Sequence, residues 1–311
     1  MKFSELRNLT RNLSREQMEN MSSVQRNLYL KKYGLNMENI YQELEMDSLY
    51  VNAHEDFSKI NDVVQLHSHN FYEILFCRSG NIQYQLGSER YRVRRGDIIV
   101  IPAGMSHQPL YLEKLTEPYR RYVLWISQNF IRYLQTICVR PAESISNACL
   151  LRTAGTSWEK MEEQFLRCCM EDQQKKPGYE LALYGGTMQL MAAMYQAARA
   201  IPPVMREKPE LADEITLYIE NHLGEKITLA QISQHFLVSE SKVSHLFLEK
   251  LGVSFYQWVI KRRLIAAKNL IQEGKTLEEV GAEVGFGDYT TFYRAFKKEF
   301  GIPPSKYREI I

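Results

Sequence analysis

Two stretches near the end of the chain decide its fold, because they repeat one pattern: residues 229–254, LAQISQHFLVSESKVSHLFLEKLGVS, and residues 277–303, LEEVGAEVGFGDYTTFYRAFKKEFGIP. Each stretch reads as a short helix, a tight turn and a second helix with an apolar stripe. Small residues, Ser233 and Gly281, stand at matching places where the two helices of such a pair must approach closely. The repeat predicts two helix-turn-helix units, which is a build typical of DNA-reading domains.

The second helix of each unit carries a polar face opposite its apolar stripe. The side chains expected on or beside these two faces are Ser241, Lys242, Ser244 and His245 in the first helix, and Tyr289, Thr290, Tyr293, Arg294 and Lys297 in the second. Short polar side chains and Arg suit the edges of bases in a major groove. A helix over 255–272, about 27 Å long, can hold the two units about one DNA turn, roughly 34 Å, apart. A single helix pair could be a plain helical hairpin, but the repetition favours a DNA reader.

The composition is that of an ordinary globular protein, with 45% hydrophobic and 24% charged residues. The net charge is only +2, and residues 226–311 hold 13 Lys and Arg against 9 Asp and Glu. Any basic surface must therefore be a local patch, and the candidates are Lys261-Arg262-Arg263 on one helix and Arg294, Lys297 and Lys298 on another. A patch is sufficient, since phosphate contacts are local.

The chain divides by its periodicity into a multidomain α+β protein. Residues 1–50 are expected to be a helical or irregular extension. Residues 51–127 alternate with period two between Gly and Pro, which favours a β-sandwich or barrel. Residues 128–203 show helical spacing, prolines at 202, 203 and 209 suggest a linker, and residues 210–311 are expected to be all helix.

No targeting or membrane segment is recognised in the sequence. The first residues are polar, and no run of eighteen apolar residues occurs. We therefore expect a cytoplasmic protein without a membrane partner. Five cysteines without a paired CxxC spacing indicate neither a disulfide framework nor a zinc knuckle.

The run VGFGD at 284–288, with TFYRAFKK at 291–298 and GIPPSKYR at 301–308, resembles the signature of the AraC/XylS family of bacterial transcription regulators. The resemblance covers the helical C-terminal domain. It implies recognition helices at about 240–250 and 288–300, with the polar residues given above as the base-facing positions and Arg294 as the strongest contact. His245 stands where family members often have Arg, so a bidentate guanine contact is not expected there, and Thr291-Phe292 replaces a usual aromatic pair. The implied partners are double-stranded promoter DNA, RNA polymerase and a second copy of the chain.

The β-rich region carries both halves of a cupin motif, HSHNFYE at 67–73 and, at 96–107, Gly96, Pro102-Ala-Gly104 and His107. On one strand, His67 and His69 would point to the same face. Glu73 and His107 are expected on neighbouring strands. Three imidazoles and a carboxylate inside a cupin barrel, a double-stranded β-helix, form a plausible site for a divalent metal such as Zn, Fe, Mn or Ni.

Three interpretations of His67, His69, Glu73 and His107 are open: a catalytic metal site, a sensory site for a metal or polar small molecule, and satisfied interior side chains. Aromatic rings such as Tyr84, Tyr72 or Trp125 could line a pocket there and stack on a sugar. The resemblance implies a sensory barrel with a sugar or other small effector, frequently without a metal, in a regulator that is more often an activator and is not an enzyme. The alternatives are a metal-dependent cupin enzyme and an effector-independent regulator with a vestigial barrel.

The helical segment 128–203 has an apolar stripe whose partner is undetermined. The resemblance implies that a homodimer forms there, and the side chains that could supply the interface are Met161, Phe165, Leu166, Met188 and Met191. The same side chains could instead pack on the back of the barrel.

Overall fold

The computed structural model describes residues 46, 48–58, 66–110, 118–137, 149–204 and 209–310. They form two compact units, Met46–Thr216 and one that contains Leu217–Ile311. The division falls inside a helix, a few residues beyond the proline-rich segment expected to be the linker. The extension expected at 1–50 lies, up to residue 45, outside the described residues.

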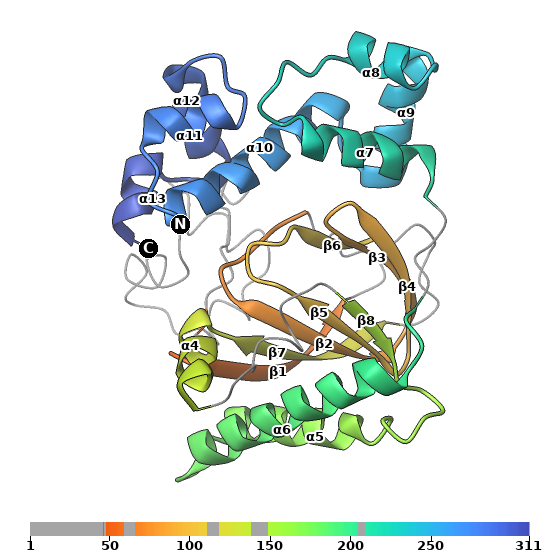
Figure 1. Cartoon of the computed structure of the whole chain (residues 1–311), viewed down its shortest axis with the longest axis vertical. Coiled ribbons are helices and arrows are strands. Elements are labelled where there is room, and N and C mark those ends of the chain that lie inside the picture. Colours follow the sequence, from red (N-terminus) through yellow and green to blue (C-terminus); the bar gives the residue numbers. More distant parts are fainter. Residues whose placement is uncertain are drawn as a thin grey trace, which may run out of the picture. The chain divides into compact units, whose positions relative to one another are not determined.

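The first unit is built from two antiparallel sheets (Figure 1). The strands are β1 (Val51–Ser58), β2 (Tyr72–Ser79), β3 (Asn81–Leu86), β4 (Glu89–Arg94), β5 (Asp97–Ile101), β6 (His107–Leu110), β7 (Tyr119–Ile126) and β8 (Cys149–Arg152). One sheet has the order β1-β7-β2-β5-β8 and the other β4-β3-β6. The α+β class, with a β-rich unit before a helical one, is confirmed.

The larger sheet is buried on both faces, which explains why β2 and β5 read as continuous apolar runs. In β2, Ile74 and Phe76 pack with the helices below the sheet. Leu75 and Cys77 point the other way and pack with Ile82 and other residues of the smaller sheet. The region between the two sheets is therefore the inside of the barrel.

One prediction in this unit is wrong: residues 128–203 are not all helical, because β8 lies within them. Its residues pair with β5 in the register Asp97↔Arg152 to Val100↔Cys149. Arg152 also binds the buried Asp97 with Nε and Nη2 at 3.0 Å from Oδ1 and Oδ2. A segment of four residues is too short to show whether its period is helical or extended. It is a strand because it pairs with the edge of β5.

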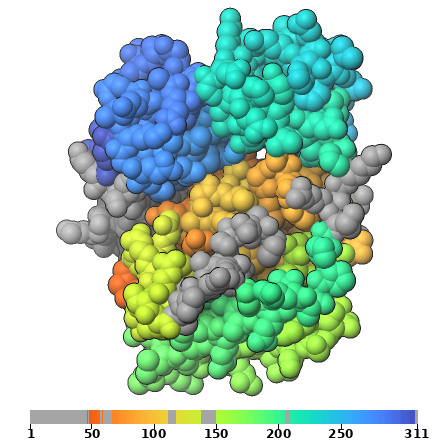
Figure 2. Space-filling model, viewed as in Figure 1, coloured from red at the N-terminus to blue at the C-terminus, as the bar shows by residue number. Residues whose placement is uncertain are grey.

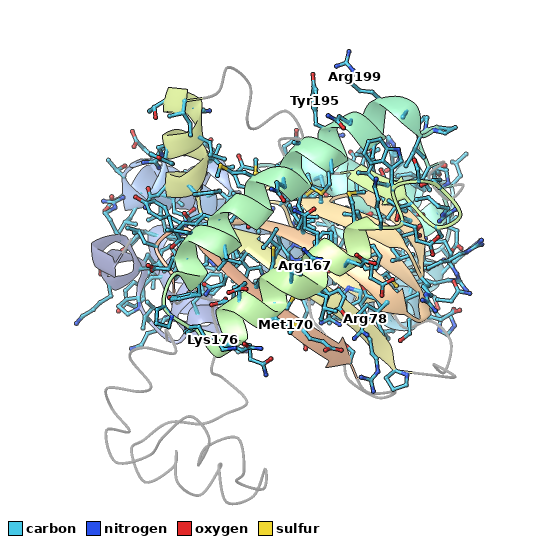
Figure 3. The ribbon with its side chains drawn as sticks, turned by 90° about the horizontal axis from the view of Figure 1, so that it is seen from below. Arg78, Arg167, Met170, Lys176, Tyr195 and Arg199 are labelled. Atoms are coloured by element: carbon cyan, nitrogen blue, oxygen red, sulfur yellow. The ribbon has the colours of Figure 1, made fainter. Side chains whose placement is uncertain are left out.

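Three described helices accompany the larger sheet: α4 (Gln128–Ile137), α5 (Met161–Gln174) and α6 (Tyr179–Ala200). Figure 1 shows α5 and α6 beneath the sheet, opposite β3, β4 and β6. Of the residues expected in the apolar stripe, Met161, Phe165 and Met191 are buried against the sheet, whereas Leu166 and Met188 are 40% and 37% exposed. Figure 3 looks onto this outer side and shows Met170 on α5, with Tyr195 and Arg199 projecting from α6.

The second unit contains the helices predicted from the repeat. They are α7 (Leu211–Asn221, which begins in the first unit), α8 (Leu229–His235), α9 (Glu240–Leu251), α10 (Phe255–Gln272), α11 (Leu277–Glu283), α12 (Tyr289–Phe300) and α13 (Pro304–Ile310). The bounds of α10 agree with the predicted spacer.

Local sequence explains where these helices begin. Thr228, Ser254 and Thr276 each form a capping box with the residue three positions on, before α8, α10 and α11. Ser239 and Asp288 cap the two recognition helices, α9 and α12, by accepting hydrogen bonds from Lys242 N and Thr291 N.

The helices of this unit form two lobes, α8–α9 and α11–α13, which Figure 1 labels as separate groups and whose atoms are teal and blue in Figure 2. Phe247 contacts Phe255 and Trp258 in the first lobe. In the second, Gly281 lies against Phe292, whose ring would be only 3.3 Å from a Cβ at that position. A small residue is therefore favoured at this close approach, because a larger side chain would press on the Phe292 ring.

Contacts of α10 hold the two lobes together. Because these contacts use the side chains of residues 261–263, the prediction that these residues form a basic patch facing DNA is wrong. Arg262 is 8% exposed and forms a bidentate ion pair with Glu220. Arg263 donates hydrogen bonds to the carbonyls of Leu223 and Glu225, and Lys261 pairs with Glu299 at 3.6 Å. These cations stabilise the fold and do not form a free DNA-facing surface.

Within the described residues, no helix is both long and apolar enough to cross a bilayer.

Candidate functional site

The polar side chains of the cupin motif meet inside the barrel, and we call His67, His69, His107 and Glu73 the barrel cluster. Glu73 lies on β2, in the larger sheet, and His107 begins β6, in the smaller one. His67 joins His107 through an isolated bridge, with His67 N to His107 O at 3.2 Å and His107 N to His67 O at 2.9 Å. Glu73 and His107 thus come from opposite sheets, not from neighbouring strands as expected.

The segment with His67 and His69 is not a regular strand, because in the part of it that the structure describes only His67 forms a β-bridge, to His107. The two rings nevertheless lie 6.1 Å apart and both face His107, at 4.2 and 4.9 Å between ring centroids. One ligand atom from each of the three histidines can be chosen so that all lie within 4.8 Å of one another. The predicted convergence of the three imidazoles is therefore found, although regular strand geometry does not produce it.

Backbone carbonyls determine how two of the imidazoles are protonated. His69 Nδ1 lies 2.8 Å from Phe71 O, and His107 Nδ1 lies 2.9 Å from Met105 O. A carbonyl oxygen only accepts, so each Nδ1 must carry the hydrogen and each Nε2 of a neutral ring has a lone pair. These Nε2 atoms lie 3.4 and 3.2 Å from Glu73 Oε2.

Aromatic side chains surround the cluster. The Trp125 indole donates a hydrogen bond to Glu73 Oε1 at 2.8 Å, and Phe71 stacks on His69 at 3.9 Å. Tyr84 is nearly parallel to His107 at 6.4 Å. Tyr72 does not belong to this group, because it packs on the helix side of the sheet. The reason is the strand period: Tyr72 and Glu73 are neighbours and point to opposite faces.

Burial and charge act against each other in the cluster. Burial lowers the pKa of His69, which favours the neutral ring. For Glu73, burial opposes the charged form, but the interactions with His107 and His69 outweigh it and hold the pKa well below the ordinary value. The site is therefore a charged carboxylate among imidazole rings, in surroundings with little water.

The chemistry of these donors fits a divalent transition metal. His107 Nε2 is fully buried, and no hydrogen-bond partner for it is found among the residues that the structure describes. Three imidazole nitrogens and one carboxylate suit Zn, Fe, Mn or Ni, whereas Mg and Ca prefer oxygen ligands only. The rings of His69 and His107 are each also held at Nδ1 by a backbone carbonyl, as is usual for metal-binding histidines.

The nine residues predicted to face DNA are all at least partly exposed on α9, α12 or their first turns. In α9, His245 is 78% exposed at its side chain and lies 3.5 Å from Glu249. In α12, the rings of Tyr289 and Tyr293 lie 6.2 Å apart. Their roles remain predictions.

Leu248, which the sequence places on the outward face of α9 together with Ser241 and Ser244, is 57% exposed.

Two family models match the chain, in the order of its two units. One, described as an AraC-like ligand binding domain, matches residues 54–124 and so contains the barrel cluster. The other, described as a helix-turn-helix domain, matches residues 232–310 and contains both recognition helices.

Curated relatives include three transcriptional regulators. The probable transcriptional regulator LumQ of Photobacterium leiognathi is 36% identical over 95 residues, which are 30% of this chain and 38% of LumQ. The arabinose operon regulatory protein of Escherichia coli is 38% identical over 97 residues, 30% of this chain and 33% of that protein. The transcriptional activator RhaR of Shigella dysenteriae is 24% identical over 254 residues, 80% of this chain and 88% of RhaR. This chain thus spans about a third of the first two relatives, and the third match extends over both units.

Proposed function

We propose that this chain, which belongs to the AraC/XylS family of transcriptional regulators, binds double-stranded promoter DNA and changes that binding when a small effector occupies its barrel. The observation that carries the first half is the pair of capped, outward-facing recognition helices, α9 and α12, joined by the single helix α10. A rigid spacer of about 27 Å is of the right length to present two helices to successive major grooves on one side of the duplex.

Base reading is assigned to the outward faces of the two helices. In α12, Arg294 and Lys297 are exposed cations next to the polar Thr290, and their charges can reach phosphates or guanine edges. In α9 the face holds Ser241, Ser244 and the apolar Leu248, which suits hydrogen bonds and a thymine methyl group. The two helices should therefore read different half-sites.

The barrel is assigned a sensory role. The barrel cluster is a set of polar side chains enclosed by aromatic and aliphatic residues, which is the usual composition of a small-molecule site. Trp125 and Tyr84 offer flat rings beside polar groups, and this combination suits a sugar or a related polyhydroxylated metabolite. The three relatives described above are regulators, which favours binding over catalysis.

Helix α7 provides a route by which an effector in the barrel could influence the DNA-binding helices. Within the first unit, the buried Arg90 of β4 holds Asp213 in the first turn of α7, with Nε 2.5 Å from Oδ1. Within the second unit, Glu220 in the last turn of α7 binds Arg262 of α10. β4 pairs with β3, and Leu86 of β3 pairs with His107 of the barrel cluster. An effector that shifts β6 therefore acts on the same small sheet that holds α7.

We infer that the active form is a homodimer that activates transcription with RNA polymerase in the cytoplasm. Support for the dimer comes from the outer side of α5 and α6, where four large apolar side chains are exposed, namely Leu166, Met170, Leu181 and Met188 (Figure 3 labels Met170). Apolar side chains at helical spacing on one surface are typical of protein interfaces.

The test of DNA binding compares two lysines of the second lobe. Lys297 of α12 and Lys306 of α13 are both exposed, and Lys297 shares a helix face with Arg294 whereas Lys306 lies on another helix. A duplex would first be selected from a random library with the full chain. We expect Lys297→Ala to weaken binding and to reduce the salt slope by about one unit, and Arg294→Ala to cost about 1–3 kcal/mol with relaxed specificity.

Lys306→Ala is the matched control, and it should leave affinity nearly unchanged. Equal losses for both lysines would show non-specific attraction and not reading by this face. If the full chain selects no duplex even at low salt, the regulator proposal fails. The effector part of the proposal is tested by titrating sugars into the complex of DNA with the wild-type chain and with the variants His69→Ala and Glu73→Gln. If no small molecule changes the DNA affinity of the wild-type chain, this part of the proposal is refuted.

A further inference from the structure

The two recognition helices have the same framework but carry different charges at equivalent places. Each helix has 12 residues, begins after a capping side chain and ends at a left-handed glycine. Counted from the caps, His245 corresponds to Arg294, at the sixth position, and Glu249 corresponds to Lys298, at the tenth. Two exposed cations in α12 therefore stand where α9 has an imidazole and a carboxylate.

His245 and Glu249 form one pair on the exposed side of α9. They lie one turn apart, their side chains are 78% and 56% exposed, and His245 Nε2 is 3.5 Å from Glu249 Oε2. Val243 and Phe247 are buried and mark the opposite side of the helix. The pair therefore points away from the core of its lobe, on the side that also carries Ser241.

The groups that this pair offers to a base are acceptors of hydrogen bonds. A carboxylate only accepts, so the hydrogen of a neutral His245 ring is favoured on Nε2, toward Glu249. The ring then has a lone pair on Nδ1, and Glu249 has the lone pairs of its carboxylate. Both residues require a donor on the base, whereas Arg294 and Lys298 are donors and require an acceptor.

Cytosine is the base that meets this requirement best. In the major groove, guanine presents two acceptors, and thymine presents an acceptor and a methyl group. Adenine presents a donor beside the acceptor N7, whereas cytosine presents its amino group alone. Because a carboxylate and an acceptor atom of a base repel each other, the pair excludes guanine and thymine and favours cytosine over adenine.

We infer that Glu249 is a specificity-determining residue of α9, whose carboxylate accepts a hydrogen bond from a cytosine amino group, and that His245 is its positioning residue. The inference rests on the proposed function, since the cytosine lies in the half-site that α9 reads. Exclusion is the larger part of the effect. A carboxylate near phosphates weakens attraction to any duplex, but it weakens attraction to guanine and thymine more.

The charges of α12 compensate for a carboxylate on α9. Helix α12 has three basic residues and one acidic residue, Glu299, which pairs with Lys261 at 3.6 Å. Helix α9 has two basic and two acidic residues. Attraction to phosphates therefore comes mainly from α12, and α9 contributes mainly discrimination between bases.

The experiment selects duplexes from a random library with the full wild-type chain and with Glu249→Gln, and then measures single duplexes by competition. The half-site whose base preferences survive Arg294→Ala is that of α9. We expect one cytosine there, and its change to thymine or guanine should cost the wild-type chain about 10-fold in affinity. Replacement of this cytosine by 2-pyrimidinone, which lacks the amino group, should cost a similar factor. In Glu249→Gln these losses should largely disappear, because an amide both donates and accepts.

Further variants separate the reading of cytosine from a change of charge. Glu240→Gln, at the start of the same helix, removes the same charge and should change no base preference. Glu249→Lys introduces the residue type of the equivalent place in α12, so it should abolish the preference for cytosine and raise the salt slope by about one unit. His245→Ala should weaken the preference, and His245→Gln should retain it, because the amide can still donate to Glu249. Circular dichroism shows whether each variant is folded.

The inference is overturned if Glu249→Gln selects the same bases as the wild-type chain, or if 2-pyrimidinone is bound as tightly as cytosine. It is also overturned if Glu240→Gln relaxes the cytosine position as much as Glu249→Gln, because the effect would then come from charge alone. In each of these cases the wild-type chain still selects a duplex, so the proposed function stands. Selection of no duplex by the wild-type chain would overturn the proposed function, and this inference with it.

Discussion

Replacing Gly285 with Ala should destabilise the second helix-turn-helix unit far more than an alanine at other left-handed glycines. Gly285 lies in the turn between α11 and α12 at φ +85°, a conformation that costs an L-residue about 1–2 kcal/mol. A Cβ there would overlap the backbone oxygen of Leu223 and lie 2.8 Å from Arg263 Nη2. Arg263 is held by carbonyls of the α7–α8 loop, so neither neighbour can move easily.

The steric part adds to the backbone part. Forcing a methyl group into a packed site typically costs 1–3 kcal/mol, so the sum is about 2–5 kcal/mol. Gly252, at the end of α9, is the matched control because its φ is +71° and nothing lies within 4 Å of a Cβ. Gly252→Ala should therefore cost only the backbone part, about 1–2 kcal/mol.

Hydrogen exchange of the full chain measures both variants, because peptides from α11 and α12 report the opening of the second lobe separately from the barrel. Protection in those peptides should fall much more in Gly285→Ala than protection in α9 falls in Gly252→Ala. The DNA affinity of Gly285→Ala should also fall, since α12 would no longer be held in place to contact DNA. Equal effects of the two substitutions would refute the claim that Leu223 and Arg263 leave no room for a side chain at position 285.

Three further substitutions test other contacts. Asp213→Ala should destabilise the first unit by about 3 kcal/mol in urea unfolding, because the buried Arg90 loses its nearest carboxylate. The control is Glu210→Ala, which removes a more exposed carboxylate 3.5 Å from the same guanidinium and should cost less than about 1 kcal/mol. Equal costs of the two substitutions would contradict this ranking. Leu248→Ala should reduce discrimination for thymine in one half-site by about 1 kcal/mol in competition binding, and an unchanged preference would remove Leu248 from the base-reading face. Leu237, at φ +55° and 90% exposed, should tolerate Asn with a gain of about 0.5–1 kcal/mol, since Asn is more easily left-handed; a lower unfolding midpoint would show that the Leu237 side chain makes a stabilising contact.

The sequence predicted the C-terminal helices well because their determinants are local. Thr228, Ser254 and Thr276 cap helices through residues three positions away, so the signal and its effect share one short stretch. The bounds of α10 followed from apolar spacing between two such signals. The strand β8 was missed, because four residues cannot reveal a period and its pairing partner lies some fifty residues earlier in the chain.

The candidate site was predicted by residue type but not by geometry. The cupin spacing named His67, His69, Glu73 and His107, yet their placement on opposite sheets depends on pairings between distant strands. Tyr72 could not be separated from Trp125 as a pocket residue until the face of each strand was known.

What the sequence by itself determined is the run of C-terminal helices and the residue types of the two candidate sites, since helical periodicity and motif spacing act over short stretches of the chain. Only the tertiary structure decided which of the candidate basic and apolar side chains are exposed and can contact a partner. Arg262 binds Glu220 and Arg263 binds loop carbonyls, so neither cation is free to bind DNA. Phe165 is buried against the sheet, whereas its neighbour Leu166 is exposed. The physical reason is that burial of a charge or an apolar ring depends on partners brought from far along the chain, and no local pattern records where those partners will lie.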